Sequence, residues 1–385
     1  MADILLESSQ IGKREDLSDL IATADRKNTP FYNSARKGAI PKNVVFQWQM
    51  DKYNDPVADT SETSSGSGND LTGVSSTIDG TDASVTGGFA ESNTRKLAQN
   101  YVHTFDKTVG IGFLAEDVSN IAGAPSELAR SVARRIVEVK REIEKHMLSR
   151  SNAVSQVTGS NSNATGYKTK ALGSFIHEDG KAGETSGDMG GTDAFTVDTA
   201  FQLTASNTTA TVAPIWTGAA TTITEEVVQN TLQGIYDNTG SVREYTGLVG
   251  TTLKRKFTNL ASTNTVQTSI SADQDSNTAG TQAAFPGIAA DQTRTVTKDQ
   301  ASKSYVSSID IFEGDFGTIT LVPDAYMDNA ANGYIIPWDE VEMAVHTAPN
   351  LSTLQNNGGG ERRLIRAIMG LKVFNPLGFG RIRCA

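Results

Sequence analysis

The most regular hydrophobic pattern in the chain is an apolar stripe within residues 126–150, SELARSVARRIVEVKREIEKHMLSR. Its apolar positions recur at steps of three and four, which is the period of one face of an α-helix. The stripe consists of Leu128, Val132, Ile136, Val139, Ile143 and Met147. Ser126 is suited to cap this helix, and Glu127 lies in the first turn, where a negative charge is favoured. The pattern predicts one long helix packed across a sheet, with a coiled coil as the alternative.

Two segments near the N-terminus alternate with the period of a strand. In NVVFQWQMDKY, residues 43–53, the apolar side chains on one face are Val44, Phe46, Trp48 and Met50. In LAQNYVHTFDKTV, residues 97–109, one face carries Leu97, Tyr101, His103 and Phe105, which we interpret as packing groups. The residues between these segments are polar and too numerous for a loop inside a compact domain. The pattern favours a long projecting hairpin, and a disordered loop is the alternative.

The remaining elements are predicted from shorter patterns. We expect an amphipathic helix over 14–26, breaks at Pro30 and Gly38, and a helix over 224–239 that Thr224 caps and Gly240 ends. A strand and a short helix follow within 248–261. Later strands are expected at 304–312, 317–323 and 333–338, and a closing strand is expected to alternate Ile365, Ala367, Met369, Leu371 and Val373. The class is α+β without a regular βαβ repeat.

One stretch, FEGDFGTITLVPDAYM, contains the Asp315-Phe316-Gly317 triplet that binds metal in protein kinases. The chain lacks the other parts of that machinery, since none of its four histidines belongs to an H-R-D motif and no suitable glycine-rich loop is present. We therefore predict that Gly314 and Gly317 flank a tight turn, and that the following strand ends at Pro323.

Composition narrows the functional classes. The 385 residues carry a net charge of −10, which argues against nonspecific binding to nucleic acid but allows the chain to enclose it. The one cysteine, Cys384, can form neither an internal disulfide nor a cysteine-rich zinc site, so we expect folding in a reducing cytosol. No signal-peptide pattern or long apolar run is present, and we expect a protein without a membrane anchor.

Candidate chemical sites are few. The Asp273 segment DQDSNTAG begins like a calcium loop but lacks its glycine and its closing glutamate, so we interpret it as a polar loop. His177-Glu178-Asp179 lies at the edge of a polar insertion at about 178–222 and is a weak catalytic candidate. Cys384 has no histidine near it in sequence, and we interpret it as incidental rather than as a nucleophile. We expect no catalytic, cofactor-binding or metal residues, and no enzyme activity.

Six segments, in this order and spacing, resemble the major capsid proteins of tailed bacteriophages with the HK-ninety-seven (Johnson) fold, in particular a branch known mainly as uncharacterised phage proteins. They are NTPFYNSARKGAIPKNVVFQWQMD, ARRIVEVKREIEKHML, TITEEVVQNTLQGIYDNTG, FEGDFGTITLVPDAYM, YIIPWDEVEMAV and ERRLIRAIMGLKVFNP.

The resemblance implies an order of parts. These are an N-terminal arm, 1–43; an extended hairpin loop, 44–108; a peripheral domain, 109–165 and 346–385, with a spine helix, 126–150; and an axial domain, 166–345, with the polar insertion. Candidate contacts between subunits are Phe46, Trp48, Met50, Tyr101, Phe105, Arg134, Arg135 and Arg141.

The resemblance also implies a function. The chain would assemble with itself into hexamers and pentamers of an icosahedral head that encloses double-stranded DNA without reading its sequence. Further partners would be portal and scaffolding or decoration proteins, and the location would be the virion capsid, after synthesis in the host bacterial cytoplasm. The alternatives are a phage tail-tube or fibre protein, and an enzyme with an unrecognised site.

Overall fold

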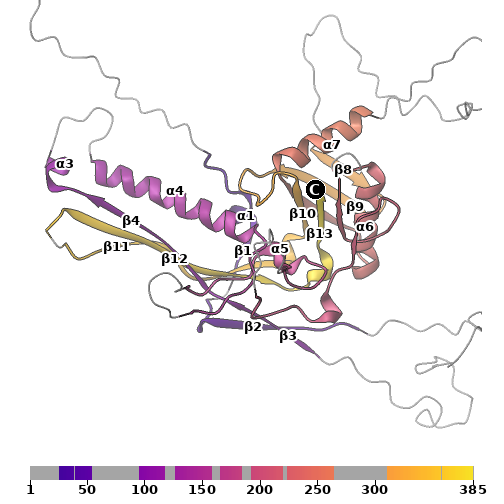
Figure 1. Cartoon of the computed structure of the whole chain (residues 1–385), viewed down its shortest axis with the longest axis horizontal. Helices are drawn as coiled ribbons and strands as arrows, with labels where there is room; N and C mark the ends of the chain where they lie inside the picture. Colours follow the sequence, from indigo (N-terminus) through magenta and orange to yellow (C-terminus); the bar gives the residue numbers. More distant parts are fainter. Residues whose placement is uncertain are drawn as a thin grey trace, which may run out of the picture.

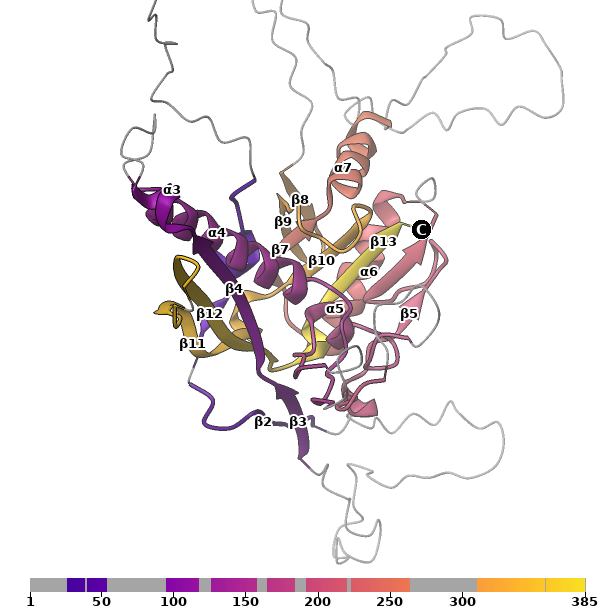
Figure 2. The same ribbon diagram turned by 60° about the vertical axis from the view of Figure 1, so that its left-hand side comes forward.

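The computed structural model describes residues 26–38, 40–53, 95–117, 126–157, 165–183, 192–219, 223–263, 310–356 and 358–384. Their elements form two separate β-sheets joined by one core, plus a two-stranded ribbon. Figure 1 shows an elongated subunit, in which the long strands β4, β11 and β12 and the helix α4 extend to one side. The larger sheet lies on the other side, with α6 and α7 packed on it, as Figure 2 shows from a second direction.

The extended side is a four-stranded sheet in the order β1-β11-β12-β4. Its strands are β1 (Arg36–Lys37), β11 (Val341–Thr353), β12 (Glu361–Val373) and β4 (His103–Ile111). β12 is antiparallel to both β11 and β4, and β1 is parallel to β11. The predicted alternation of β12 is confirmed, because its five predicted apolar positions are all fully buried.

Helix α4 (Glu127–Met147) lies across this sheet and contacts β4 and β12. Ser126 caps it as predicted, since its hydroxyl accepts a hydrogen bond from the N–H of Ala129 at 3.3 Å. Val139, Ile143 and Met147 are fully buried, and the first half of the stripe is partly buried against the same core. The packing across a sheet is confirmed, and the coiled coil is excluded. Short helix α3 (Phe113–Asp117) precedes α4 at the far end of the sheet.

The larger sheet has seven strands in the order β5-β6-β13-β10-β7-β9-β8. They are β5 (Ala205–Ser206), β6 (Ile215–Gly218), β13 (Gly380–Cys384), β10 (Asn332–Ile336), β7 (Arg243–Val249), β9 (Gly317–Pro323) and β8 (Ile311–Gly314). Helix α6 (Glu225–Thr239) packs on β13 and β6, and α7 (Thr251–Thr263) packs on β9. The predicted caps of α6 are confirmed, because Thr224 accepts from the N–H of Val227 and Gly240 adopts a left-handed φ of 64°.

The ribbon pairs β2 (Val45–Met50) with β3 (Lys96–Tyr101) in antiparallel register. The two predicted strands therefore meet, and their pairing is the base that a hairpin requires. The predicted strand at 97–109 is divided at Val102. Its first part, β3, pairs with β2, and its second part, β4, pairs with β12. Leu97, predicted on the inner face, is 51% exposed, and Asn100 is buried instead.

Three expectations about the segments need correction. Pro30 begins the short helix α1 (Pro30–Ser34) instead of breaking structure, since proline is tolerated at the first position of a helix. The expected polar insertion contains a core strand, β6, that pairs with β13. The closing segment 346–385 is divided between the two sheets, because β13 belongs to the larger one.

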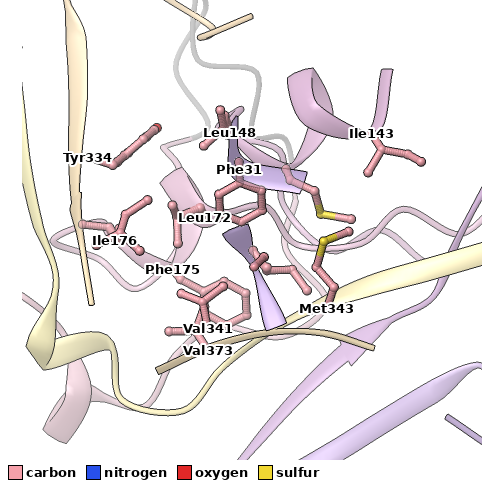
Figure 3. Close-up of a cluster of buried hydrophobic side chains, with 14 of the residues drawn as sticks. Phe31, Ile143, Leu148, Leu172, Phe175, Ile176, Tyr334, Val341, Met343 and Val373 are labelled. Carbon is pink, nitrogen blue, oxygen red and sulfur yellow. The ribbon is translucent and has the colours of Figure 1, made fainter. Parts of the chain in front are cut away.

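One core joins the two sheets. It collects residues from α1, from the ribbon, from α4, from both sheets and from the buried helix α5 (Leu172–Phe175). Figure 3 shows Phe31 of α1 near the centre of this cluster, among Leu148, Leu172 and Met343. In the described residues, 3-10 helices also form at Thr199–Phe201, Trp338–Glu340 and Pro376–Gly378. The helix expected over 14–26, the hairpin tip and the calcium-like segment at Asp273 lie outside the described residues, apart from Arg26.

Candidate functional site

The ribbon base packs onto the subunit's own sheet. The indole Nε1 of Trp48 donates a hydrogen bond to the carbonyl of Val373 on β12 at 2.9 Å, and its ring lies 6.2 Å from that of Phe175. Trp48 and Met50 are only 6% and 4% exposed. A side chain with so little exposed surface has little left to offer a second molecule. The inner face of β2 is therefore a core face and not an outward one.

This burial corrects part of the predicted contact set. Trp48, Met50 and also Phe105, which is 6% exposed, are core residues of the subunit. Phe46 and Tyr101 are partly exposed at the margin of the ribbon. The ring of Tyr101 lies 4.7 Å from that of Phe195. The roles of Phe46 and Tyr101 as contacts between subunits remain predictions.

The three charged candidates lie on α4. Arg134 and Arg135 are exposed, and Arg135 pairs with Glu138 one turn along the helix. Arg141 is partly buried, with its guanidinium 5.3 Å from the ring centre of Tyr326. A single exposed ion pair stabilises a helix by less than about 1 kcal/mol, so Arg135 could exchange Glu138 for a partner on a neighbour at little cost.

Two pairs of exposed apolar side chains that the pattern analysis did not select lie near the ribbon and on α3. Ile40 and Tyr53 flank the ribbon strand β2, with 67% and 96% of their surface exposed. Phe113 and Leu114 of α3 are 52% and 80% exposed at the far end of the four-stranded sheet. Adjacent exposed apolar residues often mark interaction surfaces. The sequence signal was the pair Phe-Leu directly after a strand, in GFLAED.

Two histidines pack together between β4 and α4. Nδ1 of His103 lies 3.3 Å from Nε2 of His146, which also lies 3.0 Å from the carbonyl oxygen of Thr169. Burial, reinforced by the nearby charges, lowers the pKa of His103 to about 3, and burial lowers the pKa of His146 to about 4. Both rings are therefore neutral near pH 7, as the interpretation of His103 as a packing group requires.

A cleft of about 590 Å³ opens beside this pair. Its lining includes His103, His346, Lys42 and Lys168, together with Tyr167. These lining residues offer ammonium, imidazole and phenol groups.

The other chemical candidates take ordinary places. The side-chain ligand atoms of His177, Glu178 and Asp179 lie within 4.8 Å of one another, but both carboxylates are exposed. Asp315 belongs to the turn between β8 and β9, where Gly314 pairs with Gly317, so the predicted turn is confirmed. Cys384 is 2% exposed, and burial raises the pKa of its thiol. Within the described ranges, no helix is long and apolar enough to cross a membrane.

Known proteins resemble this chain over its length. A family model described as SU10 major capsid protein matches residues 6–384. The capsid asymmetric unit of cyanophage A-1(L) aligns with a TM-score of 0.55 at 13% identity, over 98% of this chain and 97% of that chain. The capsid of a native GTA particle aligns with a TM-score of 0.51 at 10% identity, over 98% and 97%. The capsid of cyanophage P-SCSP1u gives 0.50 at 10% identity, over 99% and 97%. No curated protein sequence matches.

Proposed function

The chain belongs to the SU10 major capsid protein family and has a structural role in a bacteriophage capsid, and we propose that it builds an icosahedral head by self-assembly into hexamers and pentamers. The structural neighbours show the HK-ninety-seven-like α+β fold over nearly the whole chain. The observation that carries the proposal is the family match over residues 6–384.

We propose a division of labour that follows the two sheets. The four-stranded sheet with α4 as its spine helix forms the peripheral domain, and the seven-stranded sheet with α6 and α7 forms the axial domain. This division assigns β13 to the axial domain, although the resemblance implied the peripheral one. Residues 44–108 form the extended hairpin loop, whose base is the β2–β3 ribbon.

The proposed contacts use the candidates that remain available on the subunit surface. They are Phe46, Tyr101, Arg134, Arg135 and Arg141. The exposed pair on α3 adds an apolar contact at the far end of the peripheral domain. Contacts of this kind are individually weak, but a closed shell repeats them in every subunit, and their sum stabilises the assembly.

The charge of the chain suits a container for DNA. A net charge of −10 repels phosphate, so packaged double-stranded DNA would not adhere to the wall. Portal and scaffolding or decoration proteins are the further partners in this proposal, and the subunit would be made in the host bacterial cytoplasm before entering the virion capsid.

Negative-stain electron microscopy of the purified protein, with its scaffold where one is needed, tests the proposal. Shells or rings of five and six subunits are the expected result. Rods would favour a tail-tube or fibre protein instead. A compact monomer under all assembly conditions would overturn self-assembly and leave an enzyme with an unrecognised site as the alternative.

Deletion of the hairpin tip, Asp59 to Asn93, tests the segment assignment. We expect a subunit that folds with unchanged circular dichroism but assembles poorly, because the reach toward a neighbour is lost while the ribbon base remains. A variant in which the same segment is replaced by a glycine-serine linker of equal length separates reach from specific contact. Normal shells from the deletion would contradict the hairpin assignment.

A further inference from the structure

A basic cleft lies on the face of the four-stranded sheet that is turned away from α4. Along β4 and β12, the apolar residues that face α4 are buried, whereas Thr104, Asp106 and Arg366 on the opposite face are exposed. The ribbon covers one end of this outer face, where the ring of Phe46 lies against Gly370. Figures 1 and 2 show α4 and the ribbon on opposite sides of the sheet. Beside the ribbon opens the cleft of about 590 Å³.

Positive side chains line this cleft. Lys42 precedes β2 and Lys168 precedes α5, and both residues are exposed. Within the part of the chain that the structure describes, neither ammonium group forms a salt bridge. His346 adds an exposed imidazole, and none of the described lining residues is acidic. Two ammonium charges without a carboxylate partner favour an anionic occupant.

The positive charge continues along the outer face of β12. Arg366 and Arg362 lie two and six positions before Ile368 of the cleft lining, so all three side chains share one face of the sheet. Both arginines are exposed. Asp106 of β4 lies opposite Arg366 in the register and balances one of these charges. The cleft and the two arginines therefore form one basic track, which leads from the ribbon toward the far end of the sheet.

One segment of the chain has the complementary charge. Residues 54–94 contain seven aspartates and glutamates and no lysine, arginine or histidine. Within them, residues 70–82, DLTGVSSTIDGTD, combine three aspartates with three large apolar residues. The cleft offers apolar groups next to its lysines, from Val44, Val102 and Ile368. An acidic peptide of this composition suits both parts of the lining, whereas a nucleic-acid backbone presents charge without apolar side chains.

The direction of the ribbon favours a cleft on a second copy of the chain. Residues 54–94 connect the end of β2 to the start of β3, where Met50 pairs with Lys96. The cleft lies at the opposite end of the ribbon, beside Val44 and Val102. The ribbon is about 20 Å long, so the chain leaves it on the side away from its own cleft. Half of the segment, about 20 residues, spans up to about 70 Å when extended, which is enough to reach a neighbouring subunit.

We propose that the basic track of one subunit binds the acidic segment 70–82 of a second copy. This inference rests on the proposed self-assembly and names the surface that receives the hairpin loop. Carboxylates of the segment pair with Lys42 and Lys168, and its apolar side chains contact the apolar part of the lining. Acidic residues on either side of it lie along Arg366 and Arg362. Because these ion pairs are exposed, each is individually weak and is screened by salt.

Disulfide trapping between two full-length variants tests the contact. Thr104→Cys places a thiol in the cleft at an exposed, uncharged position, and Thr77→Cys places one in the acidic segment. The two variants are mixed in equal amounts under assembly conditions, oxidised, and analysed by non-reducing electrophoresis and peptide mass spectrometry. The native thiol of Cys384 is buried, so it does not compete. The matched control for the cleft is Thr251→Cys, an exposed threonine at the start of α7.

We expect the pair of Thr104→Cys and Thr77→Cys to form at least about five-fold more cross-chain disulfide than the pair of Thr251→Cys and Thr77→Cys. Lys42→Glu and Lys168→Glu, added to the Thr104→Cys chain, should remove most of that excess, and so should about 1 M salt. Equal cross-linking of the two pairs overturns the inference. An excess that the two glutamates leave unchanged also overturns it.

Two further measurements separate the alternative occupants. In a chain that carries both Thr104→Cys and Thr77→Cys, an internal disulfide without cross-chain product would assign the cleft to the subunit's own segment and overturn the second copy. A labelled DNA duplex that binds the wild type more tightly than the Lys42→Glu, Lys168→Glu variant, with cross-linking unchanged, would assign the cleft to phosphate instead.

Disulfide trapping detects the contact and not the shape of the particle. Cross-links without shells or rings would support the inference and refute the proposed icosahedral head. Shells without the cross-link would refute the inference alone.

Discussion

Lys170 is a fully buried ammonium group whose removal should destabilise the subunit strongly. Neither its side chain nor that of its partner Asp193 has exposed surface. The Nζ atom donates to Oδ2 of Asp193 at 2.5 Å, to the carbonyl of Gly180 at 2.6 Å and to that of Phe195 at 2.9 Å. Oδ1 of Asp193 accepts the N–H groups of Ala153 and Phe195. Every polar atom of the pair is therefore satisfied in the folded state.

The substitution Lys170→Met keeps the length of the side chain and removes its charge and its three donors. It leaves the Asp193 carboxylate without a counter-charge and two carbonyl groups without their donor. Breaking a buried ion pair by removing one partner costs about 3–5 kcal/mol, which is a large part of the stability of a typical domain. We therefore expect the free energy of unfolding to fall by about that amount, measured by urea denaturation and followed by circular dichroism.

A surface pair provides the control. Lys107 pairs with Glu142, and their side chains are 32% and 45% exposed. Such pairs contribute at most about 1 kcal/mol, so Lys107→Met should change the free energy of unfolding by no more than that. If Lys170→Met lowers the free energy of unfolding no more than Lys107→Met does, the buried ion pair does not stabilise the subunit.

A second substitution shows whether Lys170→Met loses stability because the Asp193 carboxylate is left unpaired or because packing is lost. Asp193→Asn, added to Lys170→Met, removes the unpaired charge while its oxygen can still accept both backbone N–H groups. We expect the double variant to be more stable than Lys170→Met alone, because an unpaired buried charge is the larger penalty. A double variant that is equally or less stable would refute the electrostatic explanation and attribute the loss to packing.

Two further predictions use the ribbon and the histidine pair. Trp48→Ala should lower the free energy of unfolding, measured by urea denaturation, by about 3–5 kcal/mol. Gln47→Ala, at the exposed neighbouring position, should change it by less than about 0.5 kcal/mol. Equal effects of the two substitutions would contradict the core assignment of β2. The pKa values of His103 and His146 are lowered to about 3 and about 4 in the folded chain. Below pH 6.5 both histidines therefore bind protons in the unfolded chain but stay neutral in the folded chain. The free energy of unfolding should therefore fall as the pH drops from about 6.5 to about 4, and His146→Gln should reduce this slope, while an unchanged slope would count against the buried neutral pair.

Local periodicity predicted the elements that carry their own signal. The stripe of α4, the caps of α6 and the alternation of β12 each depend on residues only a few positions apart, and the structure confirms all three. The fold family was accessible from the order of six such segments. The same approach missed most of β11, because His346, Pro349 and Asn350 interrupt its apolar alternation. Shifts of register near these residues and the free edge of the strand accommodate them.

Where the sequence pattern was weak, contacts with distant segments determined whether a residue is in the core. β6 offers only two large apolar residues, Ile215 and Trp216, inside a polar stretch, and its pairing with β13 and the burial of both side chains show that it belongs to the core. The aromatic face of β2 was read as an outward surface, because the partner that covers it, β12, lies more than three hundred residues later. Among the predicted contacts, Trp48, Met50 and Phe105 are core residues, whereas Arg134 and Arg135 on α4 are exposed.

Several buried polar side chains lie where segments distant in sequence pack against one another. A local sequence pattern cannot reveal such positions. Asn100 is fully buried, and its side chain makes four hydrogen bonds, to the carbonyls of Lys170 and Leu371 and from the N–H groups of Tyr101 and Lys170. It therefore fixes the ribbon, the segment before α5 and β12 relative to one another. Glu144 of α4 does the same for α1, because its carboxylate oxygens accept the N–H groups of Phe31 and Tyr32. Apolar packing alone tolerates small displacements, whereas a buried amide or carboxyl group loses its partners when the two segments shift. Such directional hydrogen bonds therefore hold the segments of one subunit in a single relative orientation.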